Sequence, residues 1–395
     1  MMVLDDIIRL EKQYYCPVFS RQKVCFTRGE DVHLFDTEGN RYTDFLSGIG
    51  VCCLGYSDEG YKDALRGAID SLMHTSNLFY NEVQSRLAEL LCKATGYDNA
   101  FFSNSGAEAV EGALKLALKY HYALGKPRRG IITLKGSFHG RTLATLAATG
   151  QSRFHEAFRP LPKSFVHVDP KDPGELKDAV NGGTAAVMIE PIIGEGGVSP
   201  VSGDFLAAAR EACDKHGALL IADEIQCGMG RTGTLLASEA SGIKPDVVVL
   251  AKALGGGVPI GAFLARGEAA RAFSAGDHGS TFGGNQLACT AAYYVVNKLV
   301  STDLMRRVAD TGEYFISKLK ELKEKSRKIV QVRGRGLMIG AELAPDASAK
   351  EIQTSLLALG FVTATAGTNT LRFLPPYIIR REHIDSLIGA LETLL

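Results

Sequence analysis

Short apolar runs alternate with helical patterns between about residue 85 and residue 265 of this 395-residue chain. The runs are apolar on both faces, which is typical of strands in a buried, mostly parallel sheet with helices on either side. The pattern therefore predicts a large α/β domain with a central sheet flanked by helices. The runs that we expect to be strands are residues 100–102, 130–133, 185–189, 218–222, 247–250 and 261–264.

The two ends of the chain show a different pattern. Residues 32–36 and 41–45 alternate around the turn Thr37-Glu-Gly-Asn40, which predicts an antiparallel hairpin. Residues 1–12 have the pattern of an acidic amphipathic helix. Towards the C-terminus we expect helices at 303–325 and 381–394 and strands at 336–343 and 370–374. We therefore expect a large domain of residues 46–301 and a smaller α+β domain formed by residues 1–45 and 302–395.

Composition narrows the classes of function. Lys plus Arg equals Asp plus Glu at 44 each, so no basic surface indicates binding to nucleic acid. No apolar stretch has the length of a membrane span or of a signal peptide, so we expect a cytoplasmic protein. The eight cysteines form no C-x-x-C pair, and Cys52 and Cys53 are adjacent, so we expect free thiols. The nine histidines do not cluster at ligand spacing, so we expect no metal.

Polar residues follow four of the apolar runs. Ser103 to Gly106, Glu190, Asp223 and Lys252 each come shortly after one of them. In α/β sheets a ligand binds outside the carboxyl ends of the strands. The sequence therefore predicts that these residues line one site.

Lys252 and Asp223 suggest a particular chemistry. Burying a lysine cation at a strand end is costly, which lowers the pKa of the amine and makes it available as a nucleophile. A buried carboxylate such as Asp223 needs a cationic partner, and the protonated ring nitrogen of pyridoxal 5′-phosphate (PLP) is one. The alternatives are a lysine that extends to solvent and an aspartate in a purely structural ion pair.

Residues 101–109 predict the start of a helix. Ser105 and Glu108 fit the capping box S-x-x-E, and a capped helix start with small residues presents N–H groups that suit a phosphate. The alternative is an ordinary helix cap. No G-x-x-x-x-G-K-[ST] motif is present, so a nucleoside triphosphate is not the expected ligand.

Several motifs together resemble one enzyme family. They occur in the order typical of the class III aminotransferases, which are PLP enzymes of fold type I, and the resemblance covers nearly the whole chain. Within that family the chain is most similar to acetylornithine aminotransferases, through residues 74–81, 226–233 and 370–375. The motifs are Ser103-Asn-Ser-Gly-Ala-Glu-Ala, Ser137-Phe-His-Gly-Arg-Thr142, Glu190-Pro-Ile-Ile-Gly-Glu-Gly-Gly197, Asp223-Glu-Ile-Gln, Lys252-Ala-Leu-Gly-Gly-Gly and Ser280-Thr-Phe-Gly-Gly-Asn285.

The resemblance implies a PLP-dependent transferase of fold type I and gives roles to residues around the cofactor. Lys252 would hold PLP as a Schiff base and later move the proton. Asp223 would pair with the ring nitrogen, and Gln226 would reach the phenolic oxygen. Phe138 and Ile225 would cover the two faces of the ring, although either could simply belong to the core.

The resemblance also implies contacts to the phosphate and to a second subunit. Ser105, Gly106 and Ala107 would hold the phosphate, and Thr281 would reach it from the neighbouring subunit. That arrangement implies a homodimer with shared active sites. Ser280, next to Thr281, is a candidate for contact with the substrate.

Two arginines set the expected substrate class. Arg141 resembles the residue that binds the α-carboxylate of an ω-amino donor, and Arg372 the residue that binds the α-carboxylate of glutamate or 2-oxoglutarate. Glu195 would pair with Arg372 when no dicarboxylate is bound. Taken alone, either arginine could belong to an exposed ion pair.

These roles imply PLP-dependent transamination of N2-acetyl-L-ornithine with 2-oxoglutarate, giving N-acetylglutamate 5-semialdehyde and glutamate in arginine biosynthesis. Other donors remain open, namely ornithine, succinylornithine, 4-aminobutyrate or an acylated lysine. An aminomutase is a further alternative. A non-enzymatic PLP-binding regulator is disfavoured, because the chain has neither spare residues for a DNA-binding domain nor a basic bias.

The chain departs from the family in one segment. Many relatives have Gly-His-x-His-Pro where this chain has Gly55-Tyr-Ser-Asp-Glu-Gly60. We expect this difference to change the start of a helix near the dimer interface and to leave the catalytic residues unaffected.

Overall fold

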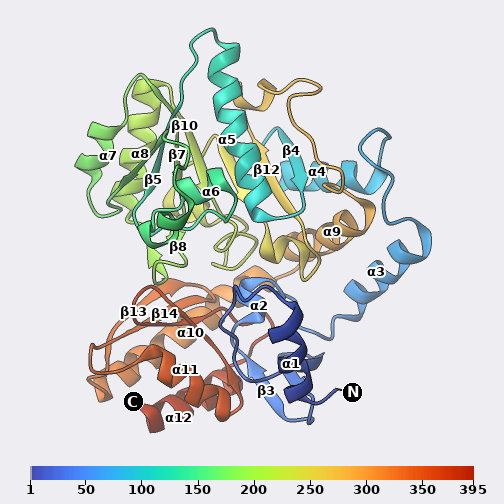
Figure 1. The fold of residues 1–395 in the computed structure, drawn as a ribbon, viewed down its shortest axis with the longest axis vertical. Helices are drawn as coiled ribbons and strands as arrows, with labels where there is room; N and C mark the ends of the chain where they lie inside the picture. Colours follow the sequence, from blue (N-terminus) through green and yellow to red (C-terminus); the bar gives the residue numbers. More distant parts are fainter. Residues whose placement is uncertain (1) are drawn as a thin grey trace.

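A seven-stranded sheet forms the centre of the larger, upper part of the computed structural model, which describes residues 2–395 (Figure 1). Its strand order is β4-β12-β11-β10-β7-β5-β6. β12 is antiparallel to both β11 and β4, and all other neighbouring strands are parallel, so the predicted mostly parallel sheet is confirmed. The strands are β4 (Asn99–Ser103), β5 (Gly130–Leu134), β6 (Phe165–Val168), β7 (Thr184–Ile189), β10 (Leu219–Asp223), β11 (Val247–Leu250) and β12 (Gly261–Ala265).

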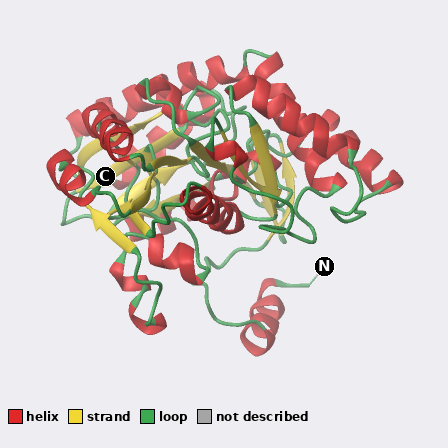
Figure 2. Ribbon diagram, turned by 90° about the horizontal axis from the view of Figure 1, so that it is seen from above, coloured by secondary structure: helices red, strands yellow, loops and turns green. Residues whose placement is uncertain are grey.

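Helices cover both faces of this sheet because successive strand residues point to opposite sides (Figure 2). Val247 and Val249 of β11 pack in the cluster that contains α5 (Gly106–Ala123), together with α6 (Leu143–Ala148). Val248 and Leu250 pack in the cluster on the other face. That other face is covered by α4 (Glu82–Thr95), α7 (Pro173–Ala179), α8 (Gly203–His216) and α9 (Gln286–Ser301).

A smaller body is formed by both ends of the chain. β15 (Phe361–Val362) pairs in parallel with β3 (Arg41–Asp44), so the blue and red parts of the ribbon lie side by side (Figure 1). β3 also pairs with β2 (His33–Asp36), as the hairpin prediction required, and β1 (Phe26–Glu30) lies beyond β2. This pairing supports a small domain made from both termini, and we propose its boundaries near residues 46 and 302.

The C-terminal part adds a four-stranded antiparallel sheet of order β13-β14-β17-β16. The predicted strands and helices lie close to the observed ones, but β13 and β16 were not predicted. The elements are α10 (Leu304–Lys325), β13 (Ile329–Arg335), β14 (Met338–Leu343), α11 (Ala349–Ala358), β16 (Ala364–Ala366), β17 (Thr370–Phe373) and α12 (Arg381–Leu394).

The helices α1, α2 and α3 precede the strands of the central sheet. α1 (Leu4–Tyr14) begins later than predicted, Met1 lies outside the described residues, and α2 spans Ser47–Gly50. α3 (Glu59–Ser71) begins after Asp58, whose carboxylate accepts a hydrogen bond from the Tyr61 N–H (3.0 Å) and pairs with Lys298 of α9. The segment that departs from the family therefore supplies a helix cap.

No helix within residues 2–395 combines the length and the apolar composition that crossing a bilayer requires.

The strand register brings the predicted site residues to one edge. Ala222 is paired with Ile189 of β7, and Asp223 with Val249 of β11. Glu190, Asp223 and the segment that carries Lys252 therefore leave the sheet together. This is the carboxyl edge at which ligands bind in α/β sheets.

Candidate active site

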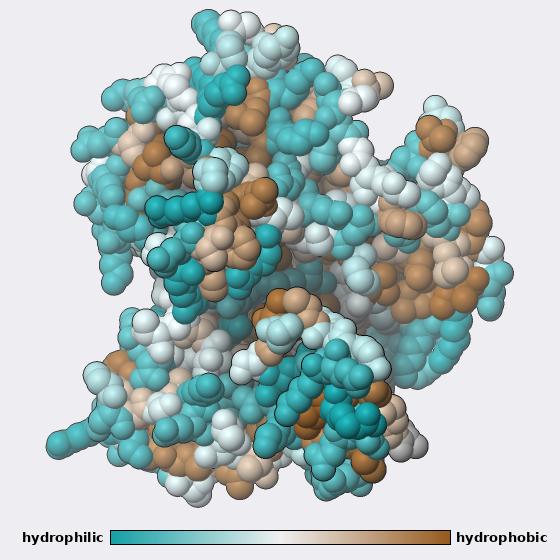
Figure 3. Space-filling view, in the orientation of Figure 1, coloured by the Kyte–Doolittle hydropathy of each residue, from teal (hydrophilic) through white to brown (hydrophobic). Residues whose placement is uncertain are grey.

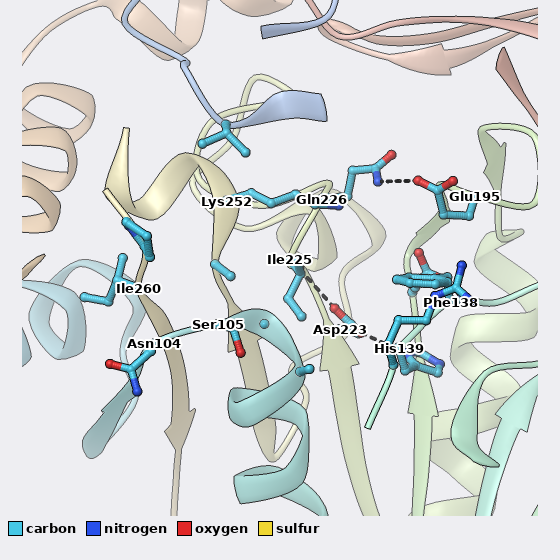
Figure 4. A pocket seen from close by; sticks show the side chains of 18 of the residues that line it. Asn104, Ser105, Phe138, His139, Glu195, Asp223, Ile225, Gln226, Lys252 and Ile260 are labelled. Carbon is cyan, nitrogen blue, oxygen red and sulfur yellow. Dashed lines mark hydrogen bonds and ion pairs between the residues drawn. The ribbon is translucent and has the colours of Figure 1, made fainter. Parts of the chain in front are cut away.

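A cavity of about 470 Å³ opens at this carboxyl edge (Figure 4). It lies among the loops that follow β4, β5, β7, β10 and β11. The structure thus brings together residues from Val51 to Ile260, which lie far apart in the chain. Ten of the predicted site residues line it, namely Ser105, Gly106, Ala107, Phe138, Arg141, Glu195, Asp223, Ile225, Gln226 and Lys252.

Lys252 is the first residue of a 3-10 turn, η4 (Lys252–Gly255), just beyond β11. Its φ of +47° is in the left-handed region, which costs a residue with a side chain roughly 1–2 kcal/mol. Within residues 2–395 its amine makes neither a hydrogen bond nor an ion pair. Burial lowers the pKa of the Lys252 amine, and the nearby Arg372 lowers it further, although Glu195 and other carboxylates oppose these effects. The result is an amine that loses its proton more readily than an ordinary lysine.

Asp223 ends β10 and is 3% exposed. One carboxylate oxygen accepts a hydrogen bond from the Ile225 N–H (3.1 Å), and the other lies 2.7 Å from Nδ1 of His139. Because an ionised carboxylate only accepts hydrogen bonds, His139 donates from Nδ1. His139 is buried, and its Nε2 has no partner within the described chain. Sequence reasoning missed His139, since 84 residues separate it from Asp223 and no spacing rule links the two.

The start of α5 forms another wall of the cavity. Ser105 caps the helix, as predicted, by accepting a hydrogen bond from the Glu108 N–H (3.2 Å). The second half of the expected capping box is wrong, because the Glu108 carboxylate accepts from the N–H of Asn104 (2.6 Å) and not of Ser105. The N–H groups of Gly106 and Ala107 find no acceptor within residues 2–395, so they are available to an anion.

Phe138 and Ile225 come from different loops on the lining of the cavity (Figure 4). Ile225 packs against the start of α5, where a Cβ added to Gly106 would lie only 2.8 Å from Cδ1 of Ile225. Glycine at position 106 therefore lets the helix start approach Ile225 closely.

Arg372, Glu195 and Gln226 form a connected group beside the cavity. Arg372 lies on β17, is 3% exposed, and pairs with the Glu195 carboxylate. Gln226 donates to Glu195 and accepts from Arg372, each at 3.4 Å. Burial acts to raise the pKa of Glu195, but the charge and the hydrogen bond of Arg372 outweigh it and the net shift is downward. Arg372 does not itself line the cavity and is reached through Glu195.

Arg141 differs from Arg372 in exposure and in pairing. Arg141 is exposed and its guanidinium lies over the rings of Phe154 (4.0 Å) and Phe138 (5.4 Å). No carboxylate pairs with Arg141 anywhere in residues 2–395. The site therefore contains one paired, buried guanidinium and one exposed guanidinium without an anionic partner.

Ser280 and Thr281 lie outside the cavity of their own chain. Ser280 is connected to it, because its hydroxyl accepts a hydrogen bond from the side chain of Asn104 (3.1 Å), which lines the cavity. Thr281 is exposed on the same loop. The structure of one chain thus does not bring Thr281 to the other predicted cofactor ligands.

Residues 16–395 match the protein family described as Aminotransferase class-III. The chain belongs to the class III aminotransferases. It is 46% identical to the acetylornithine aminotransferase of Methanocaldococcus jannaschii, over 99% of this chain and 98% of the relative. It is similar in structure to the N-acetylornithine aminotransferase of Stenotrophomonas maltophilia K279a (38% identity, TM-score 0.85, 98% of each chain). The ornithine aminotransferase of Toxoplasma gondii ME49 is also similar (31% identity, TM-score 0.95, 100% of this chain and 95% of that one).

Class III aminotransferases depend on PLP, and the cavity fits this cofactor. The free N–H groups at the start of α5 suit its phosphate, and the Asp223 carboxylate suits its ring nitrogen. The unpaired Lys252 amine is available for its aldehyde. When bound, PLP supplies an aldehyde that takes up an amine and a protonated ring that accepts electrons from the neighbouring C–H bond. The enzyme is therefore a PLP-dependent transaminase.

Proposed function

We propose that this enzyme transfers the δ-amino group of N2-acetyl-L-ornithine to 2-oxoglutarate. The products are N-acetylglutamate 5-semialdehyde and glutamate, and the reaction belongs to arginine biosynthesis in the cytoplasm. Full-length similarity to acetylornithine aminotransferases supports the choice of donor, including 46% identity to that of Aquifex aeolicus over 95% of this chain.

The main support for this proposal is that the two arginines differ in exposure and in their pairing with a carboxylate. Arg141 is exposed and has no carboxylate partner within residues 2–395, so it can receive the single carboxylate of the donor and leave the distal amine to reach the cofactor that Lys252 would hold. Arg372 is masked by Glu195 and therefore does not compete for that carboxylate. 2-Oxoglutarate has two carboxylates, and its α-carboxylate binds Arg372 once Glu195 moves aside.

The acetyl group of the donor suits the surroundings of Arg141. An unmodified ornithine carries an α-ammonium next to its α-carboxylate, and this cation would approach the Arg141 guanidinium. Because no carboxylate pairs with Arg141 within residues 2–395, no acidic partner compensates this repulsion there. Acylation removes the charge and so favours the acylated donor.

The chain's own groups then orient the reactants and move the proton. We propose that Asp223, oriented by His139, holds the ring nitrogen and that Gln226 contacts the phenolic oxygen. Phe138 and Ile225 confine the ring between them. With the cofactor bound, Lys252 Nζ would take the proton from the donor carbon and deliver it to the cofactor. Holding donor, ring and amine in one geometry accounts for much of the expected rate.

Homodimer formation is part of the proposal. Large apolar side chains are exposed on α3 and on the segment that follows it, and brown atoms gather over this part of the surface in Figure 3. The Thr281 loop is attached to that segment, because Asn77 donates to the carbonyl oxygens of Ser280 (3.0 Å) and Gly283 (2.8 Å). A second copy on this surface would receive Thr281 near its phosphate site. The apolar residues are Ile69, Leu72, Met73, Leu78, Phe79 and Tyr80.

An absorbance titration of the PLP-loaded enzyme tests the proposal. N-acetylornithine is expected to deplete the visible band of the lysine-bound cofactor at low concentration, and 2-oxoglutarate to restore it. Ornithine is the first donor to compare with N-acetylornithine, because the structure of this chain is similar to that of the ornithine aminotransferase of T. gondii, with a TM-score of 0.95. Better depletion by ornithine or 4-aminobutyrate would contradict the proposed donor and leave the transaminase assignment intact. Lys252→Ala is expected to abolish turnover.

A further inference from the structure

Glu190 is a buried carboxylate to which the functions described above give no role. It follows β7 directly, is 5% exposed, and lines the cavity. One of its oxygens accepts a hydrogen bond from the N–H of Phe138 (2.8 Å). The other accepts from the N–H of Gly194 (3.1 Å). No cation forms an ion pair with Glu190 within the part of the chain that the structure describes.

The two N–H groups belong to different loops with different tasks. Phe138 lies in the loop after β5, which also carries Arg141 at the cavity. Gly194 immediately precedes Glu195, the residue that pairs with Arg372. One side chain therefore connects the wall of the cofactor cavity to the residue that controls Arg372.

The two loops also touch directly. A Cβ added to Gly196 would lie 2.7 Å from the carbonyl oxygen of Gly136, so the absence of a side chain lets the backbones approach. Glu190 is thus placed to set the spacing of both loops at once.

We propose that Glu190 is a positioning residue whose ionised carboxylate holds the Phe138 loop and the Glu195 loop in register. The inference rests on the proposed transamination, because it assigns Phe138 to the cofactor and Glu195 to the exchange of substrates. Both carboxylate oxygens must be acceptors, since each faces an N–H donor. A glutamine at this position would direct its NH2 group at one of these donors and release one loop.

The surroundings of Glu190 make its charge sensitive to pH. Burial raises the pKa of the Glu190 carboxyl to about 7; the positive charge of His139 opposes this shift and the negative charge of Asp223 adds to it. Lys252 and Cys227 are the other titratable groups near Glu190, and the negative charge of Glu190 acts to raise the pKa of each. Protonation of Glu190 would remove one of its two acceptors, with the same consequence as the glutamine substitution.

Three variants test the proposal in single-turnover measurements of each half-reaction on the holoenzyme. Glu190→Gln keeps the size of the side chain but loses one acceptor, and Glu190→Asp keeps the charge but is too short to reach both loops. Both are expected to slow the half-reaction with N-acetylornithine and the half-reaction with 2-oxoglutarate by about 10- to 100-fold, the usual effect of losing a hydrogen bond to a charged group. The circular dichroism of the cofactor band is expected to change in both.

Glu224→Gln is the matched control. Glu224 follows β10, is fully buried, also has a pKa raised by burial to about 7, and accepts the N–H groups of Ala237 and Ser238, but it does not line the cavity. This variant is expected to lose stability while both half-reactions stay within about threefold of the unsubstituted enzyme. Equal slowing in Glu224→Gln would overturn the positioning role.

Two further results would overturn it. Near-normal rates in Glu190→Asp with slow rates in Glu190→Gln would mean that only the charge matters, and near-normal rates in both would mean that neither loop depends on Glu190.

If Glu190→Gln does not fold, hydrogen exchange on the unsubstituted holoenzyme replaces the kinetic test. Protection of the Phe138 and Gly194 segments, corrected for intrinsic exchange rates, must then fall together as the pH drops through about 7; protection that stays constant, or that falls in one segment alone, would overturn the proposal.

The unsubstituted enzyme separates this proposal from the proposed function. If it does not react with N-acetylornithine, the proposed donor is wrong, and the same variants are compared using the donor that the unsubstituted enzyme accepts. The role of Glu190 is then judged on that donor and on 2-oxoglutarate.

Discussion

Substitution of Glu195 by glutamine tests the pairing on which the exchange of substrates depends. The change keeps the size of the side chain and its hydrogen-bonding capacity but removes the negative charge beside Arg372. The Arg372 side chain is 4% exposed and that of Glu195 is 30% exposed. Breaking a fully buried pair costs roughly 3–5 kcal/mol and an exposed pair about 0–1 kcal/mol. The exposure of this pair lies between these two cases, so we expect its loss to lower the free energy of unfolding by ~1–3 kcal/mol.

A double-mutant cycle isolates the interaction. Glu195→Gln leaves a buried guanidinium without its partner, whereas adding Arg372→Met removes that guanidinium. The double variant is expected to regain most of the lost stability. Urea denaturation of the apoenzyme at one protein concentration measures each corner of the cycle. A coupling energy indistinguishable from zero would refute the reasoning.

The same substitution has a kinetic consequence. In Glu195→Gln, Arg372 is permanently available to a carboxylate, so the KM for 2-oxoglutarate is expected to fall by about tenfold, equivalent to ~1.4 kcal/mol. Glutamate should also inhibit the half-reaction with N-acetylornithine more strongly. An unchanged KM for 2-oxoglutarate together with unchanged inhibition would show that Glu195 does not mask Arg372.

Three further changes test other parts of the site. Lys252→Met should stabilise the apoenzyme at pH 7, because burial lowers the pKa of the Lys252 amine and the folded enzyme therefore binds fewer protons than the unfolded chain. The unsubstituted enzyme then gains stability as the pH rises towards 10.5, so the stability advantage of the variant should shrink over this range. An advantage that is constant between pH 7 and 10 in thermal unfolding would contradict this. His139→Phe should weaken PLP binding by about tenfold, since Asp223 loses the donor at 2.7 Å, and an unchanged Kd in a fluorescence titration would exclude that role. Gly106→Ala should also weaken PLP binding, because its Cβ would lie 2.8 Å from Ile225, whereas Gly389→Ala on α12, where the added Cβ meets nothing within 4 Å, is the control; equal PLP affinities would refute the steric argument.

Two of the strands that the sequence pattern did not predict share a physical feature. β6 and β13 lie at the edges of their sheets, where one side of the strand has no neighbour. β6 is partly exposed along most of its length, and β13 contains alternating polar residues, so neither forms the continuous apolar run that revealed the central strands. The central strands β7, β10 and β11 are buried throughout, which is why their pattern was clear.

The sequence by itself determined the mostly parallel sheet, the order of the family motifs, and the positions of Lys252 and Asp223 at strand ends. These are local properties, because periodicity and motif spacing depend on neighbours in the chain. Only the tertiary structure decided that His139 orients Asp223 and that Glu190 joins two loops, whereas the family resemblance had already implied the pairing of Glu195 with Arg372. Each of these contacts joins the ends of different strands or the loops that follow them, and such contacts depend on strand register and loop packing, which no local pattern contains.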